Sequence, residues 1–243
     1  MKYWGMTDTG LVRRENQDSY DVQPMGDYTS AVVCDGMGGE VGGRLASTVA
    51  VDVFQREMSR LLKSGMGLQQ IAQAADYTVS LANESIRKIA ADDVQYQHMG
   101  TTLVCALVES QHVVIANVGD SRAYHVSREG IRQISKDHSL VEVLIERGEL
   151  TPEAAKNHPQ RNLITRALGP DRFVQTDHFY VEWKAGDFLL LCSDGLVNTV
   201  SDQEILFEVI HGGEPDTCLD RLFALSKQRG APDNVTAVLL MNS

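Results

Sequence analysis

The sequence predicts an α+β fold in which paired helices cover an antiparallel sheet or sandwich. Short apolar runs rich in Val, Ile, Leu and Thr are typical of buried strands. Two long segments with helical spacing of apolar residues, about Gly43–Leu62 and Leu68–Ile89, follow each other with no strand between them. Because a doubly wound parallel sheet alternates strictly between strand and helix, adjacent helices disfavour that class.

The predicted strands lie on both sides of this helix pair. They are Ser30–Cys34, Thr101–Val108, His112–Asn117, Arg122–Val126, Asp187–Cys192 and Asn234–Leu240. In the second helix, apolar side chains recur every three or four residues and therefore share one face. The first helix has a broader apolar face, and a third helix is expected at Asp216–Gln228.

The stretch from Lys136 to His178 is the least regular part of the chain. It holds a short predicted helix, His138–Arg147, followed by glycines and prolines that break regular structure. Segments of this kind are usually surface excursions beside a site. No repeat, low-complexity tract or linker interrupts the chain, so we expect a single domain over residues 1–243.

Charge and cysteine usage exclude several functions. With 33 acidic and 22 basic residues the net charge is −11, so nucleic acids and anionic membranes would be repelled. Four cysteines form no CxxC pair, which disfavours a zinc site or a disulfide scaffold; Cys34, Cys105 and Cys192 lie in apolar runs and are expected in the core. Without a signal-type segment or a run near the ~18 apolar residues of a membrane span, we expect a cytoplasmic protein with no membrane insertion.

Aspartates at the ends of predicted strands are the most informative pattern. Asp35, Asp120 and Asp194 each follow an apolar run, and Asp233 shortly precedes one. Converging carboxylates repel one another unless a cation lies among them, and oxygen ligands without clustered Cys or His favour Mg²⁺ or Mn²⁺ over Zn²⁺. Neighbouring glycines are expected to let the chain turn there. Aspartate and glycine are also common in ordinary turns, so spacing alone leaves both interpretations open.

A polar segment near the N-terminus, Gly10–Asp18, contains Arg13 and Arg14. A guanidinium group is a planar fork that fits phosphate oxygens. Taken alone, this segment is explained more simply as a solvated turn. Beside an acid-lined metal site it favours phosphoester hydrolysis, because metals reverse the field of the acids and an arginine can hold the substrate.

Seven segments resemble, in order, the motifs of the metal-dependent protein phosphatase (protein phosphatase 2C type) family in its compact bacterial form. They are GLVRRENQD, DGMGG, GTTLVCAL, NVGDSR, KDHSLVEVLIERGELTPEAAKNHPQRNLITRALG, LLLCSDGL and DNVTAVLL. The resemblance runs from about Gly10 to Leu240, and the ordered set is far more specific than any single motif. It implies a four-layer α/β/β/α fold, with a central antiparallel β-sandwich flanked by helix pairs.

The resemblance also implies a dinuclear Mn²⁺ or Mg²⁺ centre. Asp35 matches the carboxylate that bridges the two ions, and Gly36 supplies a backbone carbonyl to one of them. Asp194 and Asp233 match the remaining carboxylate ligands. Asp120 matches a ligand of a possible third, weaker ion, which it would share with Asp194.

Other roles follow from the same resemblance. Arg13 matches the phosphate-holding arginine, although Arg14 lies one position away and is an alternative. Asp18 matches an outer acid near the metal waters, and Asn234 is expected to support Asp233. The segment 136–178 matches a flap beside the active site that influences substrate choice.

The acid that protonates the leaving group is left unassigned. Many relatives carry His after DGMGG, whereas this chain has Glu40, which could donate a proton only with a raised pKa. His138 and His158 lie in the flap, but a helix-start residue and a residue before proline are simpler explanations for them.

The resemblance implies hydrolysis of phosphoserine or phosphothreonine in proteins by a metal-activated water, without a phosphoenzyme. The expected partners are phosphorylated proteins and an opposing bacterial Ser/Thr kinase, and the chain is expected to be a monomer. One alternative is a catalytically weak regulatory or phosphoprotein-binding module with the same fold, which the complete ligand set disfavours. Another is a phosphatase of small molecules, which only the resemblance disfavours.

Overall fold

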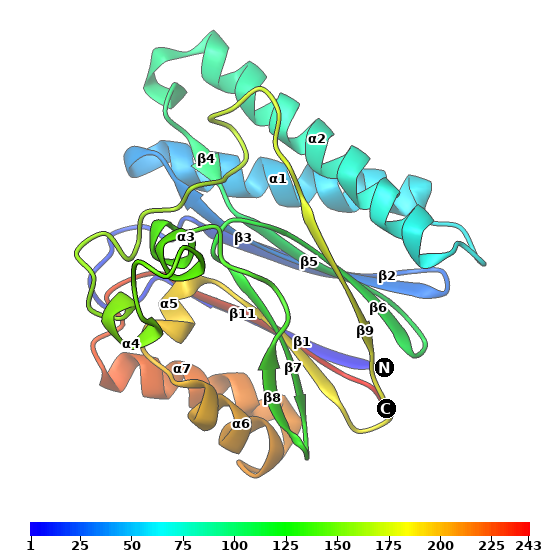
Figure 1. The fold of residues 1–243 in the computed structure, drawn as a ribbon. Helices are drawn as coiled ribbons and strands as arrows, with labels where there is room; N and C mark the ends of the chain where they lie inside the picture. The colour runs from blue at the N-terminus through cyan, green and yellow to red at the C-terminus, as the bar shows by residue number, and fades with distance from the viewer.

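Two antiparallel sheets stack face to face, and helices cover the outer face of each (Figure 1). The figure shows a computed structural model of residues 1–243, in which every residue is described except for the side chain of Glu40. The first sheet has the order β1 (Lys2–Asp8), β11 (Val235–Met241), β10 (Phe188–Cys192), β7 (Arg122–Ser127) and β8 (Gly130–Gln133). The second has the order β2 (Asp18–Met25), β3 (Tyr28–Met37), β5 (Leu103–Glu109), β6 (His112–Val118) and β9 (Asp177–Glu182), and the short β4 (Gly100–Thr101) pairs with β3.

Helices form the two outer layers. Over the second sheet lie α1 (Gly39–Leu61) and α2 (Leu68–Asp92), and over the first lie α5 (Asp194–Val197), α6 (Asp202–Ile210) and α7 (Cys218–Gln228). The irregular segment carries α3 (Leu140–Glu146) and α4 (Pro152–Ala155), and short 3₁₀ turns occur at Val94–Tyr96 and Pro215–Thr217. The expected fold class, a four-layer α/β/β/α sandwich of antiparallel sheets between helix pairs, is confirmed.

The central strands are apolar throughout because both of their faces are buried. In β3, Val32 and Cys34 pack against the helix pair, whereas Ala31 and Val33 pack against the opposite sheet. The other central strands follow the same alternation between an inner and an outer core. Burial on both faces replaces the usual apolar–polar alternation with a continuous apolar run, which is the pattern that predicted these strands. All four cysteines are free and buried.

The four strands that the sequence prediction missed are the four that lie at the edges of the sheets: β1, β8, β2 and β9. Edge strands pair on one side only, and each of these carries half-exposed or exposed residues along its length. Pro24 lies in β2, where the missing amide proton is tolerated because an edge strand needs fewer ladder bonds. Helix α6 was also missed.

Other boundaries differ by a few residues. The predicted strand Thr101–Val108 is interrupted at Thr102, between β4 and β5. Helix α1 begins at Gly39, four residues before its predicted start, so Gly43 lies in its first turns. A side chain at Gly43 would place its Cβ 2.7 Å from the backbone of Gly36, so a glycine lets α1 begin directly against the end of β3.

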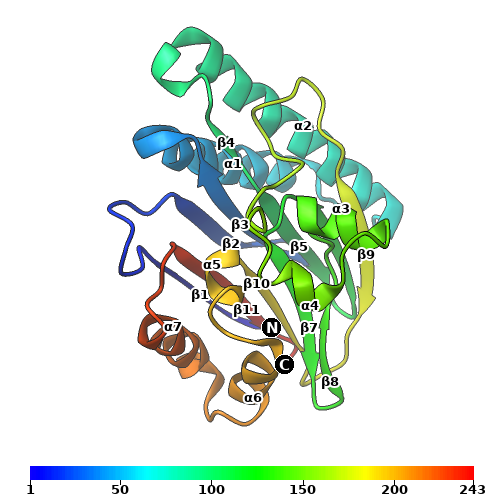
Figure 2. The same ribbon diagram turned by 60° about the vertical axis from the view of Figure 1, so that its left-hand side comes forward.

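In the described part of the chain, no helix is both long and apolar enough to cross a membrane. Figure 2 shows the segment 136–178, with α3 and α4, projecting beside the end of the sandwich at which α5 begins.

Candidate active site

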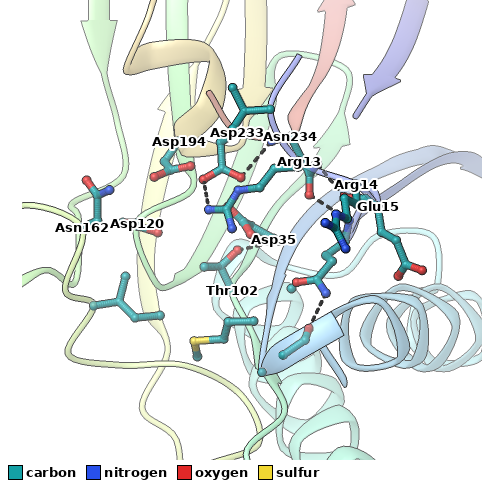
Figure 3. Close-up of a pocket in the computed structure, with 17 residues that line it drawn as sticks. Arg13, Arg14, Glu15, Asp35, Thr102, Asp120, Asn162, Asp194, Asp233 and Asn234 are labelled. Carbon is teal, nitrogen blue, oxygen red and sulfur yellow. Dashed lines mark hydrogen bonds and ion pairs between the residues drawn. The ribbon is translucent and has the colours of Figure 1, made fainter. Parts of the chain in front are cut away.

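A pocket of about 660 Å³ opens at this end of the sandwich (Figure 3). Its walls come from the loop before β2, the end of β3, the turn after β6, the start of α5 and the residues just before β11. Six of the predicted site residues line it together: Arg13, Asp35, Gly36, Asp120, Asp194 and Asp233. Residues separated by more than two hundred positions therefore meet in one cavity.

Asp35 is held rigidly because it lies within β3 and not, as expected, after its end. The Thr102 hydroxyl accepts a hydrogen bond from the Asp35 amide at 2.9 Å, and the Thr102 amide donates to the Asp35 carbonyl at 2.9 Å. The Thr102 hydroxyl in turn lies 2.7 Å from that of Ser121. The break between β4 and β5 at Thr102 thus serves to fix the backbone of Asp35.

The glycines beside two of the acids allow close packing and do not form the turns that the sequence suggested. Gly36 lies in β3 and Gly195 lies in α5. A Cβ at Gly195 would lie 1.9 Å from the Asn234 carbonyl oxygen, and one at Gly36 would lie 2.1 Å from the Gly43 carbonyl oxygen. Only a residue without a side chain lets α5 approach the segment that carries Asp233.

Gly119 does form the expected turn. Its φ of 106° lies in the region that favours glycine, and Asp120 follows it directly after the buried strand β6. A Cβ at Gly119 would also lie 2.6 Å from the Thr102 side chain.

Asn234 joins the loop that carries the arginines to the strand that follows Asp233. Its side-chain oxygen accepts from the Gln17 amide at 2.9 Å, and its side-chain nitrogen donates to the Thr9 and Glu15 carbonyls at 2.9 Å. Its own amide donates to Asp233 Oδ1 at 2.9 Å. Asn234 therefore supports Asp233 through its backbone amide, while its side chain holds the loop that carries Arg13 and Arg14.

Arg13 and Arg14 both line the pocket. Arg13 Nη2 donates to Asp233 Oδ2 at 2.7 Å, and Figure 3 shows its guanidinium reaching between the acids. This hydrogen bond, with the charges of Asp233, Asp35 and Asp194, raises the pKa of Arg13.

The electrostatics of the pocket are dominated by buried acids. Burial, followed by the charges of Asp18, Asp194, Asp120 and Asp233, raises the pKa of Asp35 well above its ordinary value. Burial and the charge of Asp194 raise the pKa of Asp120 to about 8. Burial and the charge of Asp233 raise the pKa of Asp194, although hydrogen bonds with Asn198 and Asp35 oppose the change. Each acid thus makes it harder for its neighbours to ionise.

Asp18 lies outside the described lining of the pocket and is 7% exposed. It pairs in register with Asp35 across β2 and β3, and Ser193 donates to its Oδ2 at 2.7 Å. Burial raises the pKa of Asp18 to about 7, against the hydrogen bonds from Thr236 and Ser193. Among the described atoms, its buried Oδ1 has no hydrogen-bond partner.

The donor set fits a hard divalent cation. The acids and the Gly36 backbone present oxygen ligands, which Mg²⁺ and Mn²⁺ prefer. A cation among them would relieve the raised pKa of Asp35, Asp120 and Asp194. Within the described residues, no three Asp, Glu, His or Cys side chains form a complete metal-binding group. Asp233 is turned toward Arg13, and Asp194 accepts from Asn198 Nδ2 at 2.9 Å.

A second pocket, of about 680 Å³, lies beneath α3 and α4 and shares Asp120, Asn162 and Asp194 with the first. His138 and His158 are absent from the described lining of both pockets. His138 is not the residue that caps α3, because Ser139 fills that position. The side chain of Glu40 lies outside the described residues.

The chain belongs to the protein phosphatase 2C family, since the model of that family, described as "Protein phosphatase 2C", matches residues 12–238. Among curated proteins, it is 37% identical to the serine/threonine phosphatase stp of Listeria innocua, over 96% of this chain and 93% of that protein. It is 34% identical to the protein phosphatase PhpP of Streptococcus pneumoniae, over 97% of this chain and 95% of that protein.

Solved structures give the same assignment. The crystal structure of the serine/threonine phosphatase Stp1 from Staphylococcus aureus matches with a TM-score of 0.93 and 37% identity, covering 100% of this chain and 95% of that one. The Mycobacterium tuberculosis serine/threonine phosphatase PstP/Ppp matches with a TM-score of 0.87 and 34% identity, covering 98% and 97%. The resemblance in the sequence motifs is thereby confirmed at the level of family and fold.

Proposed function

We propose that this chain is a protein serine/threonine phosphatase that hydrolyses phosphoserine and phosphothreonine. The observation that carries the proposal is the meeting of Arg13 and four acids in one pocket, on a fold that relatives named serine/threonine phosphatases share over nearly their whole length. An acid cluster alone would repel a phosphate group, whereas cations held by the acids, together with an arginine, would attract it.

The oxygen donors of the pocket are suited to hold two Mn²⁺ or Mg²⁺ ions. Asp35, the Gly36 carbonyl, Asp194 and Asp233 would supply the ligands, and Asp120 with Asp194 would supply a possible third site. When bound, such ions provide a nucleophilic water near neutral pH and offset charge on the phosphoryl oxygens.

The chain's own residues perform the remaining tasks. Arg13 turns from Asp233 to the phosphoryl oxygens, where its fork can donate two hydrogen bonds. Asn234 holds the loop that presents Arg13, and Thr102 holds Asp35. Asp18, fixed by Ser193, acts as an outer acid with one buried oxygen available to a water.

The substrates are phosphorylated proteins, and the opposing activity is that of a Ser/Thr kinase. The whole chain acts as one domain, with the segment 136–178 as a flap whose pocket adjoins the acid pocket. A monomeric state and a cytoplasmic location remain predictions from the sequence.

A substrate panel tests the proposal. The purified chain with Mn²⁺ is given phosphothreonine, phosphoserine and phosphotyrosine peptides of one sequence, and a small aryl phosphate. We expect kcat/KM to be highest for the phosphothreonine and phosphoserine peptides. Preference for the small ester would favour a small-molecule phosphatase, and binding of the phosphopeptides without turnover would favour a regulatory module.

A further inference from the structure

A single histidine, His138, joins the turn that carries Asp120 to both ends of the flap. It follows the last strand before the flap and is 7% exposed. Its backbone amide donates to the Gly119 carbonyl at 2.9 Å, and its ring Nδ1 accepts from the Gly119 amide at 2.9 Å. Both backbone polar groups of Gly119, the residue before Asp120, are therefore bound by His138.

The opposite side of the ring faces the returning end of the flap. His138 Nε2 lies 3.2 Å from Asp177 Oδ2 and 3.0 Å from Arg166 Nη1. Arg166 Nη1 also donates to Asp177 Oδ1 at 2.7 Å and to the Gln175 carbonyl at 3.1 Å. The His138 carbonyl accepts from the Thr165 amide at 2.7 Å.

These contacts define the tautomer of the ring. Nδ1 faces an N–H donor, so it must be the unprotonated nitrogen, and the ring proton lies on Nε2, where the Asp177 carboxylate accepts it. The two protons on Arg166 Nη1 are directed to Asp177 and the Gln175 carbonyl. Each ring nitrogen therefore has a separate task, one toward Gly119 and one toward the flap.

Gly119 depends on such bonds because it has no side chain to pack and adopts a φ of 106°. Asn117 Nδ2 adds a longer bond to the Gly119 carbonyl, at 3.2 Å, but the only described partner of the Gly119 amide is His138. Loss of that bond would free the Val118–Gly119 peptide, which lies one residue before Asp120.

We propose that His138 is a positioning residue with two separable functions: Nδ1 sets the position of Asp120 through Gly119, and Nε2 fastens the flap through Asp177. The inference rests on the proposed function, because it gives Asp120 its role as a ligand of the third, weakest cation site. The inference adds that the imidazole of His138 connects the flap to this third cation site.

Two substitutions separate the two functions. In His138→Asn the amide oxygen takes the place of Nδ1 and can accept from Gly119, but nothing reaches Asp177. In His138→Gln the amide takes the place of Nε2 and can donate to Asp177, but Gly119 loses its acceptor. Both variants are first shown to be folded by their thermal unfolding.

Two readouts are measured on each variant and on the wild type. Calorimetric titration with Mn²⁺ reports cation affinity, and limited trypsin digestion at the exposed Lys156 and Arg161 reports how firmly the flap is held. We expect His138→Gln to weaken Mn²⁺ binding at the lowest-affinity site about 10- to 100-fold, as is typical when the support of a ligand is removed. We expect trypsin to digest this variant at the same rate as the wild type. We expect His138→Asn to bind Mn²⁺ like the wild type but to be digested several-fold faster.

The crossed pattern supports the inference. Equal losses in both variants would indicate a merely structural histidine and would overturn it, as would wild-type behaviour in both. Asp120→Asn identifies which Mn²⁺ site is being read. Only the inference would fail if the wild type bound Mn²⁺ and hydrolysed the phosphothreonine peptide while His138→Gln retained the Asp120-dependent Mn²⁺ site. The proposed function would fail as well if the wild type bound no Mn²⁺.

Discussion

Arg13 forms an ion pair with Asp233 of the acid cluster, and this pair is open to solvent, with side-chain exposures of 57% and 30%. Such a pair contributes only about 0–1 kcal/mol to stability, so the guanidinium is free to exchange Asp233 for a phosphate group. The residue is thus placed for binding and contributes little to the fold.

Replacement of Arg13 should therefore affect substrate more than stability. A charge-assisted hydrogen bond contributes about 1.5–3 kcal/mol, so Arg13→Ala should lower kcat/KM about 10- to 100-fold for a phosphothreonine peptide, mainly through KM. The kcat/KM of Arg13→Lys should lie between those of the wild type and Arg13→Ala, because lysine keeps the charge but lacks the planar guanidinium fork. Steady-state kinetics at saturating Mn²⁺ measure both. Unchanged kinetics in Arg13→Ala, with a loss in Arg14→Ala, would transfer the role to Arg14.

Gly195 was noted in the sequence, but the structural reason for a glycine at this position could not be predicted from it. An added Cβ would lie 1.9 Å from the Asn234 carbonyl oxygen, and backbone cannot move aside as a flexible side chain can. Forced overpacking of this kind costs about 1–3 kcal/mol, so Gly195→Ala should lower the free energy of unfolding by that amount in urea denaturation. At Gly67 an added Cβ meets nothing nearer than 3.8 Å, and Gly67→Ala should cost about 1 kcal/mol or less. Equal stability of the two variants would show that α5 can move away from β11 freely.

At the scale of elements, burial decides which parts of the fold the sequence predicted. The central strands β3, β5, β6, β10 and β11 are apolar on both faces and were recognised, whereas the four edge strands were not. Helix α6 had a usable signal, since Ser201 and Glu204 form a capping box before the apolar residues of DQEILFEVI. The signal at β1 and β9 was weaker, because exposed and half-exposed residues interrupt their apolar patterns.

The flap provides a pH prediction at the same scale. Burial lowers the pKa of His138. The charge of Arg166 adds to this decrease, whereas the neighbouring Asp177 and Asp137 oppose it. The unfolded chain therefore takes up this proton first, and the stability that the neutral His138 ring contributes is lost as the pH falls through the ordinary histidine pKa of about 6.5. Hydrogen bonds from Arg166 and His138 outweigh burial and lower the pKa of Asp177, whose contribution is lost only in the acid range.

Chemical denaturation from pH 7.5 to 5.5, with chelator present throughout, measures this effect. As the pH falls, the free energy of unfolding of His138→Asn should rise relative to that of the wild type, because the variant cannot take up the proton. The buried acids of the pocket take up protons over the same range in both proteins and therefore cancel in the comparison. Identical slopes in the two proteins would mean that His138 is not held neutral in the folded state.

For the whole molecule, the sequence predicted the family, the layered fold and the acids of the pocket, because strands carry those acids to one end of the sandwich. Asp120, Asp194 and Asp233 lie next to the strand ends, as predicted. The supporting bonds could not be predicted, since Asn234 with Glu15 and Thr102 with Asp35 join residues far apart in the chain. The role of His138 was missed for the same reason.

The central claim is that the acid pocket holds divalent cations for phosphoester hydrolysis, and one measurement tests it most directly. Hydrolysis of a phosphothreonine peptide is followed with Mn²⁺, with Mg²⁺ and after chelation, in the wild type and in Asp35→Asn. We predict turnover that disappears with chelator and returns with Mn²⁺, and a loss of about 10³-fold in Asp35→Asn, since cations supply several kcal/mol and each 1.4 kcal/mol is tenfold in rate. Full turnover in chelator, or in a folded Asp35→Asn variant, would contradict the account.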